Sequence, residues 1–252
     1  MKKIVSPILV ALTLSAAAGA MAQTAAPAEP ESTLAFNVGA VSDYRYRGIS
    51  QSRLNPALQG GADYADKSGF YVGAWGSSIK WIQDAGAKDG NVEIDLYGGY
   101  KGAVGDVAYD VGFLRYQYQG NSLAKVAGLA DANTNEIYGA ATMGLFTAKY
   151  SYATSNLFGN KDSKGSYYLD LSAALDLGEG YSLTPHLGYQ SIAKTPDGTY
   201  TDYALTLGKD LGNGLSASAA LIGTNAKKSF YYTPAGKATG DAGLVVGVKY
   251  TF

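Results

Sequence analysis

Charged and aromatic side chains alternate strictly in the segment SDYRYRGIS, residues 42–50. Asp43, Arg45 and Arg47 occupy every second position there, with tyrosines between them. Guanidinium and carboxylate groups spaced in this way can line an aqueous passage, where they attract or repel ions and charged solutes. The segment therefore indicates the sorting of charged molecules by an electric field, a chemistry in which no covalent bond is made or broken.

The residue types of this chain do not favour nucleophilic catalysis. A serine nucleophile usually needs a histidine base and a positioned acid, and the sequence has no cysteine and one histidine, His186. His186 lies in a segment with the alternation of a β-strand. If the strands form a closed barrel, this alternation places His186 on the inner side, away from any lipid substrate. Metal sites need clustered ligands, whereas the acids are scattered over separate segments. We expect no catalytic residue, no metal site and no cofactor, and an outer-membrane lipid hydrolase is the least favoured function.

The first residues have the pattern of a secretory leader. The basic start MKK precedes the apolar run IVSPILVALTLSAAAGA, and AMA then fits the small-x-small rule for signal peptidase. We predict that residues 1–22 are a signal peptide cleaved before Gln23, which makes the protein an exported bacterial one. Residues 23–32, QTAAPAEPES, are predicted to be a periplasmic linker. Residues 33–252 remain for the folded domain.

Composition favours a sheet protein over a helical one. The chain has 33 glycines and 21 tyrosines, and glycine costs about 1 kcal/mol at each helical position. After the leader, no apolar run approaches the roughly 18 residues that a membrane helix needs. If the chain spans a membrane, it must do so with strands. The formal net charge of −1, which becomes more negative without the leader, argues against a nucleic-acid partner.

Apolar residues recur at every second position along most of the remaining chain, which is the pattern of β-strands. Twelve such segments can be recognised: 34–40, 58–64, 70–77, 92–100, 107–118, 136–144, 147–153, 167–175, 183–189, 203–207, 215–221 and 242–252. The links between them are alternately short and long. Short periplasmic turns and longer external loops are typical of outer-membrane barrels, and a sheet in lipid must close on itself. We therefore predict an all-β, transmembrane, antiparallel up-and-down β-barrel of twelve strands.

Parity along the predicted strands assigns side chains to lipid or to the lumen. The first strand turns its even-numbered apolar residues outward, and the same parity would place Tyr44 and Tyr46 in the aromatic girdle. Tyr250 and Phe252 take the same kind of position on the last strand. In the fifth strand the parity would put Arg115 in lipid, so we predict a β-bulge that turns it inward. The pore-lining candidates are then Asp43, Arg45, Arg47, Arg53, Glu93, Asp95, Arg115 and Asp202.

Three short motifs in order resemble the opening of a known family. SDYRYRGISQS, PALQGGADY and SGFYVGAWGSS resemble the TorF-type porins of Gram-negative bacteria, most densely over residues 42–78. The resemblance implies an outer-membrane barrel with pore activity, and it supplies no catalytic or binding residues. The C-terminal segment GLVVGVKYTF resembles the signal by which the barrel-assembly machinery recognises such proteins.

The leading functional hypothesis is an outer-membrane channel for passive diffusion of small hydrophilic solutes or ions. Eight-stranded barrels are filled by side chains and sixteen-stranded ones hold an aqueous channel, and twelve strands lie between these cases. In the alternative hypothesis, the interior charges pair and plug the lumen. The barrel would then be a non-conducting structural or surface-binding protein acting through its external loops. Expected partners are small solutes, outer-membrane lipids and lipopolysaccharide, which the lysines of TNAKKSFYYTPAGKATGD (residues 224–241) would meet.

Overall fold

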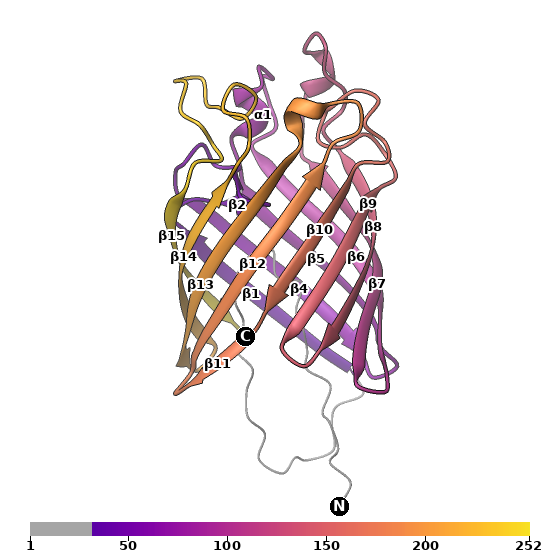
Figure 1. Cartoon of the computed structure of the whole chain (residues 1–252), viewed down its shortest axis with the longest axis vertical. Coiled ribbons are helices and arrows are strands. Elements are labelled where there is room, and N and C mark those ends of the chain that lie inside the picture. Colours follow the sequence, from indigo (N-terminus) through magenta and orange to yellow (C-terminus); the bar gives the residue numbers. More distant parts are fainter. Residues whose placement is uncertain (1–31) are drawn as a thin grey trace, which may run out of the picture.

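A computed structural model of the chain describes residues 32–252, which form one closed antiparallel β-barrel (Figure 1). The predicted signal peptide, and the predicted linker up to residue 31, lie outside the described residues. Ser32 already belongs to the first strand. No helix within residues 32–252 has the length and apolar character needed to cross a membrane.

Twelve strands make the wall of the barrel, as predicted. They are β1 (Ser32–Val41), β4 (Ala57–Asp66), β5 (Phe70–Ser78), β6 (Val92–Val104), β7 (Val107–Tyr118), β8 (Thr134–Met143), β9 (Phe146–Ala153), β10 (Tyr167–Ala173) with its continuation β11 (Leu175–Gly178), β12 (Tyr181–Ser191), β13 (Tyr200–Gly212), β14 (Leu215–Thr224) and β15 (Gly243–Thr251). Each strand pairs with its neighbours in the chain, and β1 pairs with β15. Because β10 and β11 both pair with β12, the sheet has no free edge.

Short turns and long loops alternate along the chain and collect at opposite ends of the barrel (Figure 1). The short turns are residues 67–69, 105–106, 144–145, 179–180 and 213–214. The long loops contain the small helices α1 (Trp81–Asp84), η1 (Leu123–Lys125) and η2 (Pro196–Gly198), and the short strands β2 (Arg45–Tyr46) and β3 (Ile49–Ser50). This alternation confirms the sequence-based prediction.

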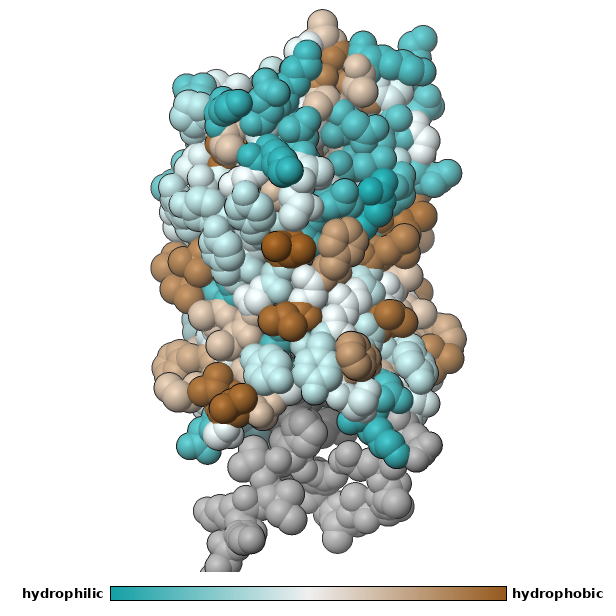
Figure 2. Space-filling view, turned by 90° about the vertical axis from the view of Figure 1, so that its right-hand side faces the viewer, coloured by the Kyte–Doolittle hydropathy of each residue, from teal (hydrophilic) through white to brown (hydrophobic). Residues whose placement is uncertain are grey.

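The outer surface of the wall is apolar, because every second side chain of each strand points away from the lumen. On β15, Leu244, Val246 and Val248 are exposed while the residues between them are less so. Tyr250 and Phe252 continue this outward face, and Phe252 stacks on Phe36 of β1 with ring centroids 5.9 Å apart. In Figure 2, hydrophobic side chains are spread over the lower part of the barrel and hydrophilic ones gather over the loop end.

Glycines and tyrosines of neighbouring strands pack against one another inside the barrel, which explains the enrichment in both residue types. The rings of Tyr97, Tyr71, Tyr138 and Tyr168 lie over Gly73, Gly99, Gly112 and Gly188, respectively, where an added Cβ would overlap the phenol. A tyrosine ring that covers a strand glycine restores the packing that the missing side chain would supply. These contacts account for part of the enrichment in glycine and tyrosine.

The predicted bulge in the fifth strand is wrong. Pairing of β7 with β6 and with β8 runs without a shift in register, so Arg115 keeps the outward parity of Val111 and Phe113. Its guanidinium bonds to Gln117 Oε1 at 2.7 Å and to Asn135 Oδ1 at 3.1 Å. The arginine therefore faces outward and does not line the lumen. These polar neighbours satisfy the hydrogen bonds of its guanidinium near the loop end of the wall.

We expect a charge on the middle of the outer surface to destabilise the barrel. Leu205, near the middle of β13, is 45% exposed. Leu205→Arg should lower the free energy of unfolding in lipid vesicles by about 2–4 kcal/mol, the cost of a cation at the bilayer midplane. Thr201→Arg, on the same face of the same strand but at the loop end, should cost at most about 1 kcal/mol. Equal costs in urea titrations would contradict an embedded outer surface.

Glycine replacements should separate crowded from open positions of the wall. Gly188→Ala would drive a Cβ into Tyr168 Oη and Asp202 Oδ2, whereas a Cβ at Gly139 meets only Val111, at 3.9 Å. Overpacking of this kind typically costs about 1–3 kcal/mol, so Gly188→Ala should lower the free energy of unfolding and Gly139→Ala should not. The difference is measurable by urea unfolding of both variants in parallel.

Candidate functional site in the barrel lumen

The segment with alternating charges and tyrosines leaves the barrel wall and folds into the lumen. After β1, Ser42 still bonds through its backbone N–H to Val246 O at 2.8 Å. The following residues 43–52, which we call the inward hairpin, form the short antiparallel pair β2–β3. Arg47 and Gly48 make its two-residue turn with φ angles of 48° and 78°, as tight hairpins require.

The tip of the inward hairpin lies against β13 and β14, which follow β15 in the order of strands around the wall. A Cβ on Gly48 would overlap the side chain of Thr224 on β14 and lie 2.7 Å from Cβ of Asp202 on β13. Gly48 therefore serves both the left-handed turn and the close approach, and no larger residue fits this position. The hairpin crosses part of the lumen instead of continuing along the wall.

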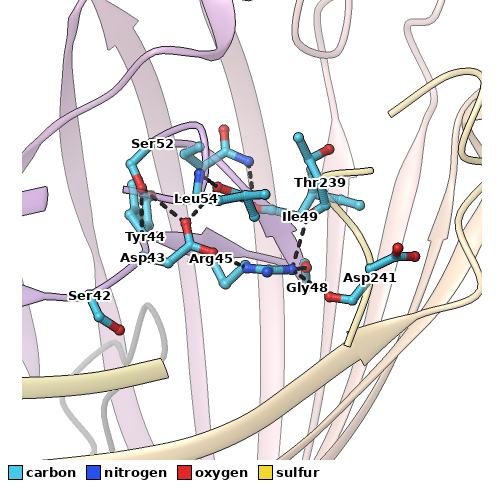
Figure 3. Close-up of polar contacts among 12 residues, drawn as sticks. Ser42, Asp43, Tyr44, Arg45, Gly48, Ile49, Ser52, Leu54, Thr239 and Asp241 are labelled. Atoms are coloured by element: carbon cyan, nitrogen blue, oxygen red, sulfur yellow. Dashed lines mark hydrogen bonds and ion pairs between the residues drawn. The ribbon is translucent and has the colours of Figure 1, made fainter. Parts of the chain in front are cut away.

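Asp43 and Arg45 fix the base of the inward hairpin (Figure 3). They form an ion pair, and Asp43 Oδ1 accepts hydrogen bonds from the hydroxyls of Ser50 at 2.5 Å and Ser52 at 3.0 Å. Arg45 Nη1 donates to the backbone oxygen of Thr239 at 2.9 Å, in the last long loop. Both side chains are almost fully buried, so this pair acts in a region that water barely reaches.

Arg47 extends from the tip of the hairpin to the far wall. Its Nη2 bonds to both carboxylate oxygens of Glu136 on β8, at 2.8 and 3.0 Å. Nη1 donates to Gln190 Oε1 on β12 at 2.7 Å. The guanidinium carbon also lies 4.9 Å and 4.3 Å from the ring centroids of Tyr46 and Tyr168. Ion pairing with a carboxylate and stacking on aromatic rings are contacts that suit the arginine side chain.

A second polar network continues from Tyr168 along the wall. Tyr168 Oη donates to Asp202 Oδ2 at 2.9 Å, and His186 Nε2 lies 2.8 Å from Asp202 Oδ1. His186 Nδ1 is 3.3 Å from Asp170 Oδ1. The histidine thus lies between two carboxylates, each held on a different strand. These contacts form a network of hydrogen bonds and ion pairs that joins three strands of the wall, β10, β12 and β13.

Glu93 and Asp95 on β6 are buried carboxyl groups with few hydrogen-bond partners. Their exposed fractions are 1% and 0%, and Glu93 Oε2 and both Asp95 oxygens have no hydrogen-bond partner. Tyr44 donates its hydroxyl to Glu93 Oε1 at 3.3 Å. Burial, together with Glu93 and Asp95, raises the pKa of the Tyr44 phenol well above its ordinary value, so Tyr44 remains a neutral donor.

The prediction that Tyr44 and Tyr46 lie in the outer aromatic girdle is wrong. Tyr44 is 3% exposed and packs edge-on against Trp75, with ring centroids 5.4 Å apart. Tyr46 packs edge-on against Tyr116 and Phe158. Parity assigns faces only while the chain stays in the wall, and it leaves the wall after Ser42.

The structure brings most of the predicted interior charges together. Asp43, Arg45, Arg47, Glu93, Asp95 and Asp202 all lie in the lumen near the inward hairpin. Arg53 does not: its side chain is 39% exposed and pairs with Asp84 of α1 in the loop region. Sequence reasoning did not select Glu136 or Tyr168, although Tyr168 shares its parity with Asp170.

The arrangement can hold charged groups but offers no metal centre. Among residues 32–252, no group of three or more His, Cys, Asp or Glu side chains is arranged to hold a metal ion. The side chains of the hairpin and its surroundings instead form ion pairs, amide contacts and aromatic contacts across the lumen. Such a site suits the binding or exclusion of charged organic groups.

Comparison with known proteins gives a family of unknown function and a porin-like fold. The model of a family described as "Bacterial protein of unknown function (Gcw_chp)" matches residues 24–252, and no curated protein sequence matches the chain. The KdgM porin has a TM-score of 0.54 at 8% identity and covers 86% of this chain and 99% of its own. A KdgM porin in complex with disordered oligogalacturonate has 0.52 at 9%, with 88% and 99% covered. The NanC porin in a rhombohedral crystal form has 0.52 at 9%, with 87% and 99% covered. At these identities the likeness concerns the fold.

Removal of the Arg47 guanidinium should destabilise the barrel strongly. Arg47→Ala leaves Glu136 buried without its cation, and breaking a buried pair in this way typically costs about 3–5 kcal/mol. The double variant Arg47→Ala/Glu136→Gln should recover part of that loss. Arg53→Ala breaks the more exposed pair with Asp84 and should cost less than about 1 kcal/mol. Urea unfolding of the four proteins tests this, and equal losses for Arg47→Ala and Arg53→Ala would refute it.

Proposed function

We propose that this chain, which belongs to the Gcw_chp family of bacterial proteins of unknown function, is an outer-membrane channel for passive diffusion of small hydrophilic solutes and ions. The observation that carries the proposal is the division of the barrel between two environments. Charged residues from many strands point into the lumen, while apolar residues cover the outside. A wall with this pattern separates an aqueous interior from a hydrocarbon exterior.

The strand number and the fold support a channel over a filled barrel. Twelve strands enclose more space than the eight of barrels that side chains fill, and the KdgM and NanC porins have a similar fold. The resemblance of residues 42–78 to TorF-type porins points the same way. In this proposal the inward hairpin is the constriction that sets which solutes pass.

Export and membrane location belong to the same proposal. The leader pattern of residues 1–22 supports export, and residues 23–32 would link the cleavage site to the barrel. The outward face of β15, which includes Tyr250 and is continued by Phe252, supports recognition by the barrel-assembly machinery. In the last long loop, Lys227 and Lys228 form exposed ion pairs with Asp197 and Asp241, at 2.8 and 2.7 Å. These lysines are the proposed contacts to lipopolysaccharide.

A second candidate is a non-conducting barrel that acts through its external loops. The observation that favours it is the filling of the lumen around the hairpin, where Tyr44, Tyr116 and Tyr118 are at most 3% exposed. Conductance recordings of the wild type, in which the hairpin is held in place, and of a variant that releases the hairpin separate the two candidates.

Conductance in planar lipid bilayers tests the channel. We expect the wild type to give small current steps, and Arg45→Ala/Arg47→Ala to give larger ones, because both anchors of the hairpin are removed. Lys227→Ala/Lys228→Ala, which removes two charges from an external loop, should conduct like the wild type. If folded wild type and folded hairpin variant are both silent, the protein is a non-conducting barrel. If only the hairpin variant conducts, the channel is closed at rest.

A further inference from the structure

We propose that the lumen site which holds the guanidinium of Arg47 is a binding site for solutes that carry a guanidinium or ammonium group. The channel would then take small organic cations in preference to anions. The transport part of this inference rests on the proposed function, whereas the binding site does not. Arg47 is in effect the part of the chain that occupies the site when no such solute is bound.

The site is built by the wall, and the arginine enters it from elsewhere. Glu136, Gln190 and Tyr168 belong to the separate strands β8, β12 and β10. They offer a carboxylate, an amide oxygen and an aromatic face. Arg47 reaches all three from a loop, with bonds of 2.7 to 3.0 Å and a ring contact of 4.3 Å. A carboxylate combined with aromatic faces is the general recognition mode for guanidinium and ammonium ligands.

Contacts that do not involve the hairpin hold the wall groups in place. Gln190 Nε2 donates to the backbone oxygens of Tyr167 at 2.9 Å and Ser191 at 3.2 Å, which turns Oε1 toward the site. Tyr116 donates its hydroxyl to Glu136 Oε2 at 3.1 Å. Tyr168 is held by its bond to Asp202. These contacts preorganise the wall groups independently of Arg47, and a preorganised site loses little affinity to reordering.

The charge around the site favours a further cation and opposes an anion. Glu93, Asp95 and Glu136 lie buried in the same part of the lumen, and three of the oxygens of Glu93 and Asp95 have no hydrogen-bond partner. Arg47 and Lys149, whose Nζ lies 4.1 Å from the Tyr138 ring centroid, are basic groups beside these three carboxyl groups. Burial favours the neutral form of carboxyl groups without partners, and a cation that enters would stabilise their ionised form, whereas an anion would not.

The geometry of the hairpin allows a solute to take the place of the Arg47 side chain. β2 and β3 are two residues each, and Arg47 is a non-glycine residue with φ of 48°, a conformation that its side-chain contacts must hold against a cost of about 1–3 kcal/mol. A solute that brings the same functional group can replace those contacts one for one. Entry of the solute would thus release the hairpin tip and widen the constriction.

The first test of binding uses a variant in which the Arg47 side chain no longer occupies the site. Arg47→Ala in detergent is heated with methylguanidinium chloride, with uncharged methylurea of similar shape, or with sodium chloride. We expect a saturable rise in Tm with methylguanidinium alone, because only this probe replaces the lost side-chain group. Arg47→Ala/Glu136→Gln should lose the rise. Indistinguishable melting curves with the three additives would overturn the proposed site.

A second measurement uses the wild type and does not depend on how well Arg47→Ala folds. Hydrogen exchange of the backbone amides of residues 44–52 should become faster with methylguanidinium, because the hairpin tip is displaced, and should not change with methylurea. Amides of β13 serve as the internal control. Unchanged exchange in the hairpin at saturating methylguanidinium contradicts the exchange of Arg47 for a solute.

Selectivity is tested by the reversal potential across a bilayer with unequal methylguanidinium chloride on the two sides. We expect cations to carry most of the current, and Glu93→Gln/Asp95→Asn to lose that preference. Asp197→Asn, in an external loop, should retain it. Chloride-dominated current overturns the inferred solute class. Binding without current supports the site and contradicts the channel, whereas current without binding contradicts the site and supports the channel.

Discussion

The closed ladder of backbone hydrogen bonds is the constraint on which every other feature of this molecule depends. Pairing of β1 with β15 and of β12 with both β10 and β11 leaves no strand edge open. An apolar exterior is compatible only with such a wall, because acyl chains offer no partner to an unpaired N–H or C=O group. Once the wall is closed, side-chain alternation divides the residues of the strands into an outer and an inner set.

The inner set is organised around the inward hairpin. Its base is fixed by Asp43 and Arg45, and its tip by the contacts of Arg47 with the far wall. The buried charges pair mostly through these residues, while Glu93 and Asp95 keep oxygens without partners. In the proposed channel, stability and permeation would therefore be linked, since the groups that hold the hairpin are the same groups that a passing solute would meet.

Local pattern predicted the wall well, because the period-two alternation and the turn lengths are both consequences of a sheet with different surroundings on its two faces. The same reasoning failed for Tyr44 and Tyr46, since their alternation with charged residues imitates a strand. Gly48, a residue suited to the left-handed position of a tight turn, was the signal that the chain turns back there. For Arg115, a bulge was invoked to avoid a charge on the outer face, whereas Gln117 and Asn135 show that this part of the face is polar. The partnership of Arg47 with Glu136 joins residues far apart in the sequence, and no local pattern carries such information.

The hairpin also has a mechanical consequence for the cylinder that contains it. A ring of twelve tilted strands resists stretching along its hydrogen bonds but yields readily to flattening, because ovalisation changes only the angles between neighbouring strands. Arg45 and Arg47 tie the β1 side of the ring to the last loop and to β8 and β12, and so act as a strut across its diameter. The bracing of the barrel wall and the filling of its lumen thus have one origin, and a variant that releases the hairpin should also have a softer wall.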